Sequence, residues 1–93
     1  MHPLQYHLVA FDWSVKVSPF DFVSAVWTWL VKYGRSFIDT PEERAQIEAV
    51  AMKFYDEVLV SRFPAFAQWR LMVQTAIQVI LLQLSAPPQG DVT

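Results

Sequence analysis

The amino-acid sequence predicts a mainly α-helical domain, a three-helix bundle-like unit with helices at about residues 19–33, 41–62 and 64–85. Two helix-start motifs, apolar residues with helical spacing after each of them, and a Phe-Pro break before the third helix predict this fold. A chain of 93 residues holds one domain at most, so we expect a single domain over residues 1–86. Residues 87–93 have little to bury and are expected to form a mobile tail.

The segment before the first predicted helix allows two interpretations. Leu4 and Leu8 are four residues apart and fit one face of a helix. From residue 8 to residue 17, however, apolar and polar residues alternate as in a strand, and the types that occur there favour extended structure. The alternating apolar residues are Trp13, Val15 and Val17. No residue of the usual capping types introduces a helix here, so we expect an N-terminal extended arm or strand over about residues 8–17.

The first predicted helix starts at Ser18-Pro19-Phe20-Asp21 and stops at Gly34. Ser18 can cap the helix, Pro19 suits the first helical position, and Asp21 can return a hydrogen bond to the cap. Between these signals, apolar residues cover most of the helix circumference and leave one narrow polar stripe.

The second predicted helix starts at Thr40-Pro41-Glu42-Glu43, a fuller capping box with an acidic first turn. Its apolar face is narrow and its opposite face is charged, so we expect it to be the solvent-facing helix. The apolar face consists of Ile47, Ala51, Phe54 and Val58. Pro64 interrupts this helix because it lacks a backbone N–H. The third helix is apolar around a thin polar stripe, so we expect it to be the central one.

The chain carries more apolar side chains than a bundle of this size can bury. Hydrophobic residues make up 54%, aromatic residues 15% and charged residues 17% of the sequence, whereas an ordinary domain has roughly 25% charged residues. We therefore expect self-association, in the simplest case as a dimer, or binding to a protein partner that the sequence does not identify. The expected interface residues are Trp13, Trp27, Trp29, Phe66 and Trp69. The alternative is that the N-terminal arm wraps and closes the bundle.

The same apolar excess is also compatible with a small apolar-ligand-binding helical protein. Three helices rich in aromatic residues can leave a cavity between them, which a few polar groups would complete. The candidate residues for this pocket are Tyr33, Tyr55, Arg70, Gln74 and Gln78.

The sequence offers few residues for catalysis or for binding a metal or cofactor. The absence of cysteine excludes disulfides, thiolate chemistry and Cys-based metal sites. His2 and His7 have no acidic partner at metal-ligand spacing. The two glycines, Gly34 and Gly90, are too few and too far apart for a phosphate-binding loop. We therefore expect a protein that is not an enzyme and has no catalytic residue, metal ligand or cofactor.

Two features of the sequence argue against a secretory signal and against a membrane span. The first seven residues lack the basic and apolar pattern of a secretory signal, so we expect a cytoplasmic protein. The uncharged stretch from Leu71 to Ala86 is shorter than the roughly 20 residues that a bilayer requires, so we expect no membrane span.

The order of the predicted elements resembles that of the ribbon-helix-helix DNA-binding proteins, in which two chains pair their N-terminal strands. The matching segments are the predicted strand at 8–17, the helix at 19–33 and the turn at residues 34–36. The resemblance covers about half the chain and implies DNA binding as an alternative function. Nucleic acid is the weaker alternative as a partner, because the strand's polar residues are net neutral and the chain has a net charge of −2.

Overall fold

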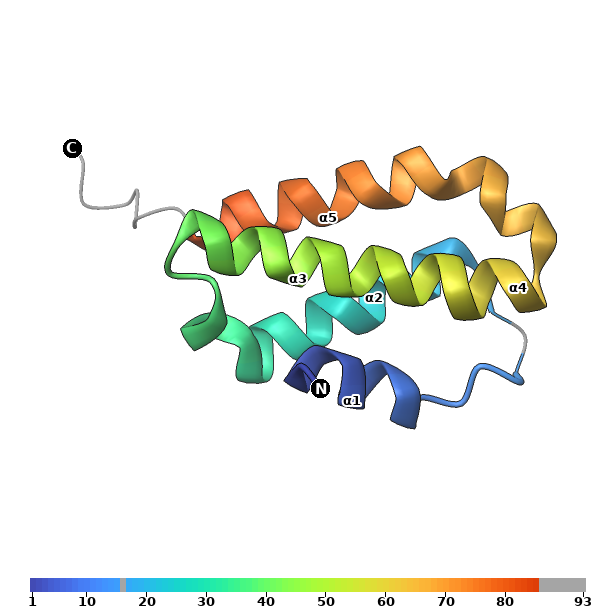
Figure 1. The fold of residues 1–93 in the computed structure, drawn as a ribbon, viewed down its shortest axis with the longest axis horizontal. Coiled ribbons are helices and arrows are strands. Elements are labelled where there is room, and N and C mark those ends of the chain that lie inside the picture. The colour runs from blue at the N-terminus through green and yellow to red at the C-terminus, as the bar shows by residue number, and fades with distance from the viewer. Residues whose placement is uncertain (16, 86–93) are drawn as a thin grey trace.

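The structure is a computed structural model in which residues 1–15 and 17–85 are described. These residues form helices and no strand (Figure 1). The helices are α1 (Pro3–Ala10), α2 (Pro19–Trp29), α3 (Pro41–Phe54), α4 (Val60–Arg62) and α5 (Arg70–Ser85). The prediction of a mainly α-helical, bundle-like domain is thus confirmed. The tail expected at residues 87–93 lies outside the described residues.

Turns of other helix types join these helices into four continuous rods. A π-helical turn, η1 (Leu30–Gly34), and a 3-10 turn, η2 (Arg35–Phe37), extend α2. A second π-helical turn, η3 (Tyr55–Leu59), joins α3 to α4. A 3-10 segment, η4 (Pro64–Trp69), leads into α5. The last three rods agree with the predicted helices to within a few residues.

The capping motifs start α2 and α3 as predicted. The Ser18 N–H donates to Oδ2 of Asp21 at 2.8 Å, and the Asp21 N–H donates to Oγ of Ser18 at 3.3 Å. Thr40 and Glu43 exchange the same two hydrogen bonds, each at 3.1 Å. Each motif satisfies N–H groups that the first turn of a helix leaves without a backbone partner. Local chemistry therefore fixes where both helices begin.

The expectation of an extended arm or strand over residues 8–17 is wrong for the first of these residues, which belong to α1. The Nδ1 atom of His2 accepts a 3.0 Å hydrogen bond from the Leu4 N–H and so caps the helix. Leu4 and Leu8 are fully buried, and this burial outweighs the β propensity of the segment. Because residues 1–15 and 17–85 contain no strand, the resemblance to ribbon-helix-helix proteins has no support in the fold.

The four rods form a ring around one core (Figure 1). Helix α1 packs against α2 and α3, and α5 packs against the same two helices from the other side. The ring of Trp13 lies 6.1 Å from that of Phe22 and 5.9 Å from that of Phe54, measured between ring centres. Its Nε1 donates a 2.7 Å hydrogen bond to the carbonyl of Leu8. The N-terminal segment therefore packs on the core against α2 and α3.

The helices contribute unequally to the core. The rod at residues 41–62 buries Ile47, Ala51, Met52, Phe54, Tyr55 and Leu59. Helix α5 buries only Val73, Ile77 and Leu81, and most of its other apolar side chains are partly or fully exposed. The roles expected for these two helices are thus exchanged: the amphipathic rod supplies the core, and the more apolar α5 lies at its edge.

The rod Pro64–Ser85 is long and apolar enough to cross a membrane, judged by length and composition alone. It spans 22 residues, whereas the uncharged stretch counted in the sequence begins only at Leu71. Only 17% of its most apolar window is buried. One such helix is weak evidence for a membrane span, and the expected absence of a span stays a prediction.

We expect Ile77→Ala to lower the free energy of unfolding by about 2 to 5 kcal/mol, because Ile77 is fully buried and its truncation leaves a cavity. Leu71 lies on the same helix but is 74% exposed. Leu71→Ala should therefore change this free energy by less than about 1 kcal/mol. Urea denaturation at low protein concentration, where association does not contribute, measures both values. Equal losses at the two positions would contradict the described orientation of α5.

The His2 cap predicts that stability falls in mild acid. Burial, and then the positive charge of the N-terminus, lower the pKa of His2 from its ordinary 6.5. Above pH 6.5 the His2 imidazole is neutral in both the folded and the unfolded chain, and the cap is intact. As the pH falls below this value, the imidazole is protonated first in the unfolded chain, so the free energy of unfolding decreases. The melting temperature should therefore drop between pH 8 and pH 5. His2→Ser retains a cap that does not titrate and should show a smaller drop. An equal drop would contradict the capping role.

Candidate interaction surface

Exposed apolar side chains gather on the outer sides of α2 and of the rod that contains α5. Six of them, each between 40% and 73% exposed, are here termed the outer α2/α5 face. They are Phe20, Trp27 and Val31 from the α2 rod, and Trp69, Met72 and Val79 from the α5 rod. Single exposed apolar residues are ordinary on protein surfaces, but a group of this size on adjoining helices is typical of an interaction site.

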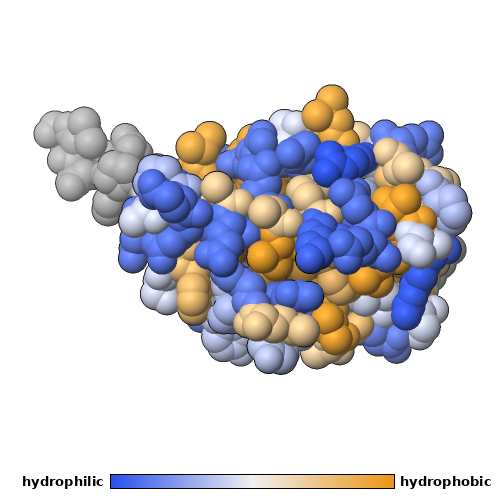
Figure 2. Space-filling model, in the orientation of Figure 1, coloured by the Kyte–Doolittle hydropathy of each residue, from blue (hydrophilic) through white to orange (hydrophobic). Residues whose placement is uncertain are grey.

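Helical spacing places these side chains in two stripes. Phe20 and Trp27 are seven residues apart and Val31 follows four later, so the three lie on one side of the α2 rod. Met72 and Val79 are also seven residues apart. Because α2 and α5 pack side by side, the two stripes adjoin. Figure 2 shows the face along α3, where hydrophilic and hydrophobic residues are mixed, and hydrophobic atoms that project at its upper edge.

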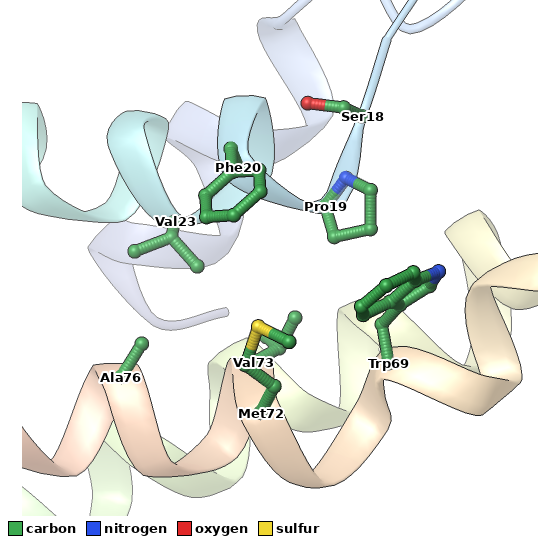
Figure 3. Close-up of a pocket in the computed structure, with 8 residues that line it drawn as sticks. All are labelled: Ser18, Pro19, Phe20, Val23, Trp69, Met72, Val73 and Ala76. Carbon is green, nitrogen blue, oxygen red and sulfur yellow. The ribbon is translucent and has the colours of Figure 1, made fainter.

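A groove of about 380 Å³ lies between the start of α2 and the first turns of α5 (Figure 3). Its lining is almost entirely apolar and consists of Ser18, Pro19, Phe20, Val23, Trp69, Met72, Val73 and Ala76. The Oγ atom of Ser18 accepts the capping hydrogen bond from the Asp21 N–H. Figure 3 shows the α2 side of the groove directly opposite Trp69, Met72 and Ala76. The volume is at the lower end of the roughly 300 to 1,000 Å³ that is usual for ligand pockets.

The corner before α5 holds the second wall of the groove in place. Phe63, next to Pro64, has φ −129° and ψ 80°, outside the helical region, so the chain turns there. The Tyr55 hydroxyl donates a 2.6 Å hydrogen bond to the carbonyl of Phe66, and the two rings stack with centres 6.2 Å apart. Burial, and then the charge of Asp56, raise the pKa of Tyr55, so its hydroxyl remains protonated and able to donate at neutral pH. The corner is thereby attached to the core.

Polar side chains tie α5 to the α3 rod along a line that we term the α3/α5 seam. Arg70 donates to Asp56 from Nε at 2.9 Å and from Nη2 at 3.0 Å. The Oε2 atom of Glu48 accepts hydrogen bonds from Nε2 of Gln74 at 2.9 Å and of Gln78 at 3.0 Å. The hydrogen bond and charge of Asp56 raise the pKa of Arg70, which stays a cation. The ion-pair side chains are 45% and 40% exposed, so the pair adds little stability. The seam mainly fixes how α5 is rotated.

The five predicted interface residues do not lie together on one surface of the structure. Trp13 and Trp29 are each 4% exposed and belong to the core, so they are not accessible to a partner in this conformation. Phe66 is half-buried against Tyr55. Trp27 and Trp69 are each 40% exposed and lie on the outer α2/α5 face. The interface itself stays a prediction.

The five candidate ligand-pocket residues do not form one pocket. Tyr33 is 65% exposed and Tyr55 is fully buried, while Arg70, Gln74 and Gln78 meet along the seam. None of the five lines the groove.

Sequence reasoning missed the groove residues, above all Phe20, Val23, Met72 and Ala76. Both helices are apolar around most of their circumference, so periodicity does not mark the side that faces the groove. The seven-residue spacing of Phe20 and Trp27 was the available signal.

Neither metal chemistry nor relatives point to another site. Within residues 1–15 and 17–85, no three His, Asp or Glu side chains converge in a way that could hold a metal ion. No protein family, curated protein or solved structure matches this chain. Arguments about function therefore rest on the surface of this chain itself.

We expect Gln74→Ala and Gln78→Ala each to lower the free energy of unfolding by less than about 1 kcal/mol, because Glu48 keeps the hydrogen bond from the other glutamine. The double variant removes both donors from Glu48, so its loss should exceed the sum of the two single losses. Urea denaturation of the wild type, both single variants and the double variant tests this. Simple additivity would contradict the shared acceptor.

Proposed function

We propose that this chain is a non-catalytic, cytoplasmic protein–protein interaction domain with a structural or adaptor role, which self-associates through the outer α2/α5 face. The observation that carries the proposal is the position of the exposed apolar side chains. Six of the exposed large apolar side chains lie on these two adjoining helices, while others, such as Tyr6 and Val9, lie on α1. Three of the six are aromatic, the class of residue that dominates the energetics of protein interfaces.

The size of the face is compatible with a stable dimer. An aromatic side chain brings roughly 150 to 250 Å² of surface, and the three aromatic members are between 40% and 73% exposed. Together with the three other members, the face offers several hundred square ångströms, of the same order as the roughly 800 Å² that each partner contributes to a standard interface. Association would remove this apolar surface from water.

The lack of charge on the face favours a partner with an equally neutral surface. The groove within it has no charged residue in its described lining, and the Arg70–Asp56 pair lies along the α3/α5 seam. An acidic peptide, a nucleic acid or an anionic lipid surface would instead require basic residues. A second copy of the same face meets the requirement without like-charge repulsion.

The groove supports a second candidate function, the binding of a small apolar ligand. Its volume and apolar lining suit such a ligand. It has few polar groups to orient one, because the Ser18 hydroxyl is used in capping. Native mass spectrometry distinguishes the two candidates: a monomer with a bound organic molecule would favour the ligand, and a ligand-free oligomer would favour self-association.

We expect the wild type to have about twice its chain mass of 10.8 kDa at micromolar concentration, and Val79→Glu to have the mass of a single chain. Val79 is 46% exposed on the outer face, and association would bury the new carboxylate without a partner. Val9→Glu is the matched control, since Val9 is 60% exposed on α1 and lies outside the face. Size-exclusion chromatography with light scattering measures all three masses. A wild type of 10.8 kDa at every concentration would refute the proposal.

A further inference from the structure

Phe20 is the most exposed residue of the groove lining. Its side chain is 73% exposed, against 40% for Trp69 and 47% for Met72 in the same lining. It lies in the first turn of α2, where Pro19 and the capping box of Ser18 hold the backbone. An aromatic side chain on a fixed backbone loses little conformational freedom when it binds. Phe20 therefore has the properties of an interface anchor.

The groove beside Phe20 has the properties of the site that such an anchor fills. Its volume of about 380 Å³ lies within the range usual for ligand pockets. Its lining is almost entirely apolar, so an aromatic ring that enters it removes apolar surface from water at little polar cost. Trp69 and Met72, both partly exposed, border this space.

We propose that two copies of this chain associate about a two-fold axis by exchanging Phe20, so that the ring of each copy fills the groove of the other beside Trp69, Met72 and Ala76. This inference rests on the proposed self-association and names the contact that drives it. A two-fold interface uses the same patch on both copies, so that patch must contain both an anchor and the site for it. The outer α2/α5 face contains both, and they adjoin.

The surroundings of the groove also fit a second copy as the occupant. Within residues 1–15 and 17–85 no charged side chain lines it, so these parts of two identical faces can approach without repulsion. Trp27 and Val79 lie further along the same face and would cover the rim of the contact, where near-neutral contacts exclude water from the anchor. The exchange therefore accounts for the exposed side chains around the groove as well as for Phe20.

Two substitutions test the exchange from its two sides. Phe20→Ala removes the anchor, and Ala76→Phe fills the groove with a side chain of its own copy. Tyr6→Ala is the control for the first, because Tyr6 is an aromatic residue, 60% exposed, on α1. Ala49→Phe is the control for the second, because Ala49 is exposed on α3. Sedimentation equilibrium gives the dimer Kd of each variant, and circular dichroism and melting temperature confirm that each one folds.

We expect Phe20→Ala and Ala76→Phe each to raise the dimer Kd by about a hundredfold or more, because one substitution removes both symmetric insertions. Both controls should stay within about threefold of the wild type. The double variant should bind no more weakly than the weaker single variant, because its second change affects a contact already lost.

Other outcomes would overturn the exchange. A dimeric wild type whose Kd changes by less than about threefold in both groove variants refutes it; self-association through the rest of the face would still stand and is tested by Val79→Glu. A wild type that is monomeric at all concentrations refutes the exchange and the proposed function together. A monomer that carries a copurified apolar molecule, or that binds vesicles of neutral lipid, does the same and assigns the groove or the face to that ligand.

Discussion

The indole of Trp13 holds the N-terminal segment against the core, and the closed ring of helices depends on this contact. Its N–H donates to the last turn of α1, while its ring packs against both Phe22 of α2 and Phe54 of α3, which stack on each other. A buried indole without that hydrogen bond would carry a desolvation penalty, so one side chain orders three helices at once. With α1 on one side of the core, only α5 is left to cover the other. Within residues 1–15 and 17–85, no further helix is therefore left to cover the outer sides of α2 and α5.

Burial in this bundle follows the contrast between helix faces more than the total apolar content of a helix. The rod at residues 41–62 has a charged side, so only one orientation toward the core is possible, and it buries the largest share of apolar side chains. Helix α5 has apolar residues nearly all round, so burying one side leaves the others exposed. Part of the apolar excess seen in the composition thus lies on the surface of the most apolar helix. Under the proposed function, association of two copies covers the part that belongs to the outer α2/α5 face.

Local chemistry made the starts of the later helices predictable from the sequence. Features that depend on contacts between distant segments could not be predicted in this way. Ser18, Thr40 and Pro64 act on their own neighbours, so the helices that follow them could be located from the sequence. Helix α1 was missed because a histidine caps it and because burial of Leu4 depends on helices that come later in the chain. The rotation of α5 depends on hydrogen bonds to a glutamate more than twenty residues away, and the walls of the groove lie about fifty residues apart. Neither arrangement leaves a periodic signal in the sequence.

The π-helical turn from Tyr55 to Leu59 determines where the rod at residues 41–62 can tolerate the loss of one residue. A π-helical turn contains one residue more than an α-helical turn, so removing one residue from its middle would leave a regular helix with both flanks in phase. Removing one residue between Ile47 and Ala51 would instead rotate everything that follows by about 100°. Phe54 and Leu59 would then turn out of the core. Related chains that share this core can therefore be one residue shorter at the π-helical turn but not in the regular part of α3.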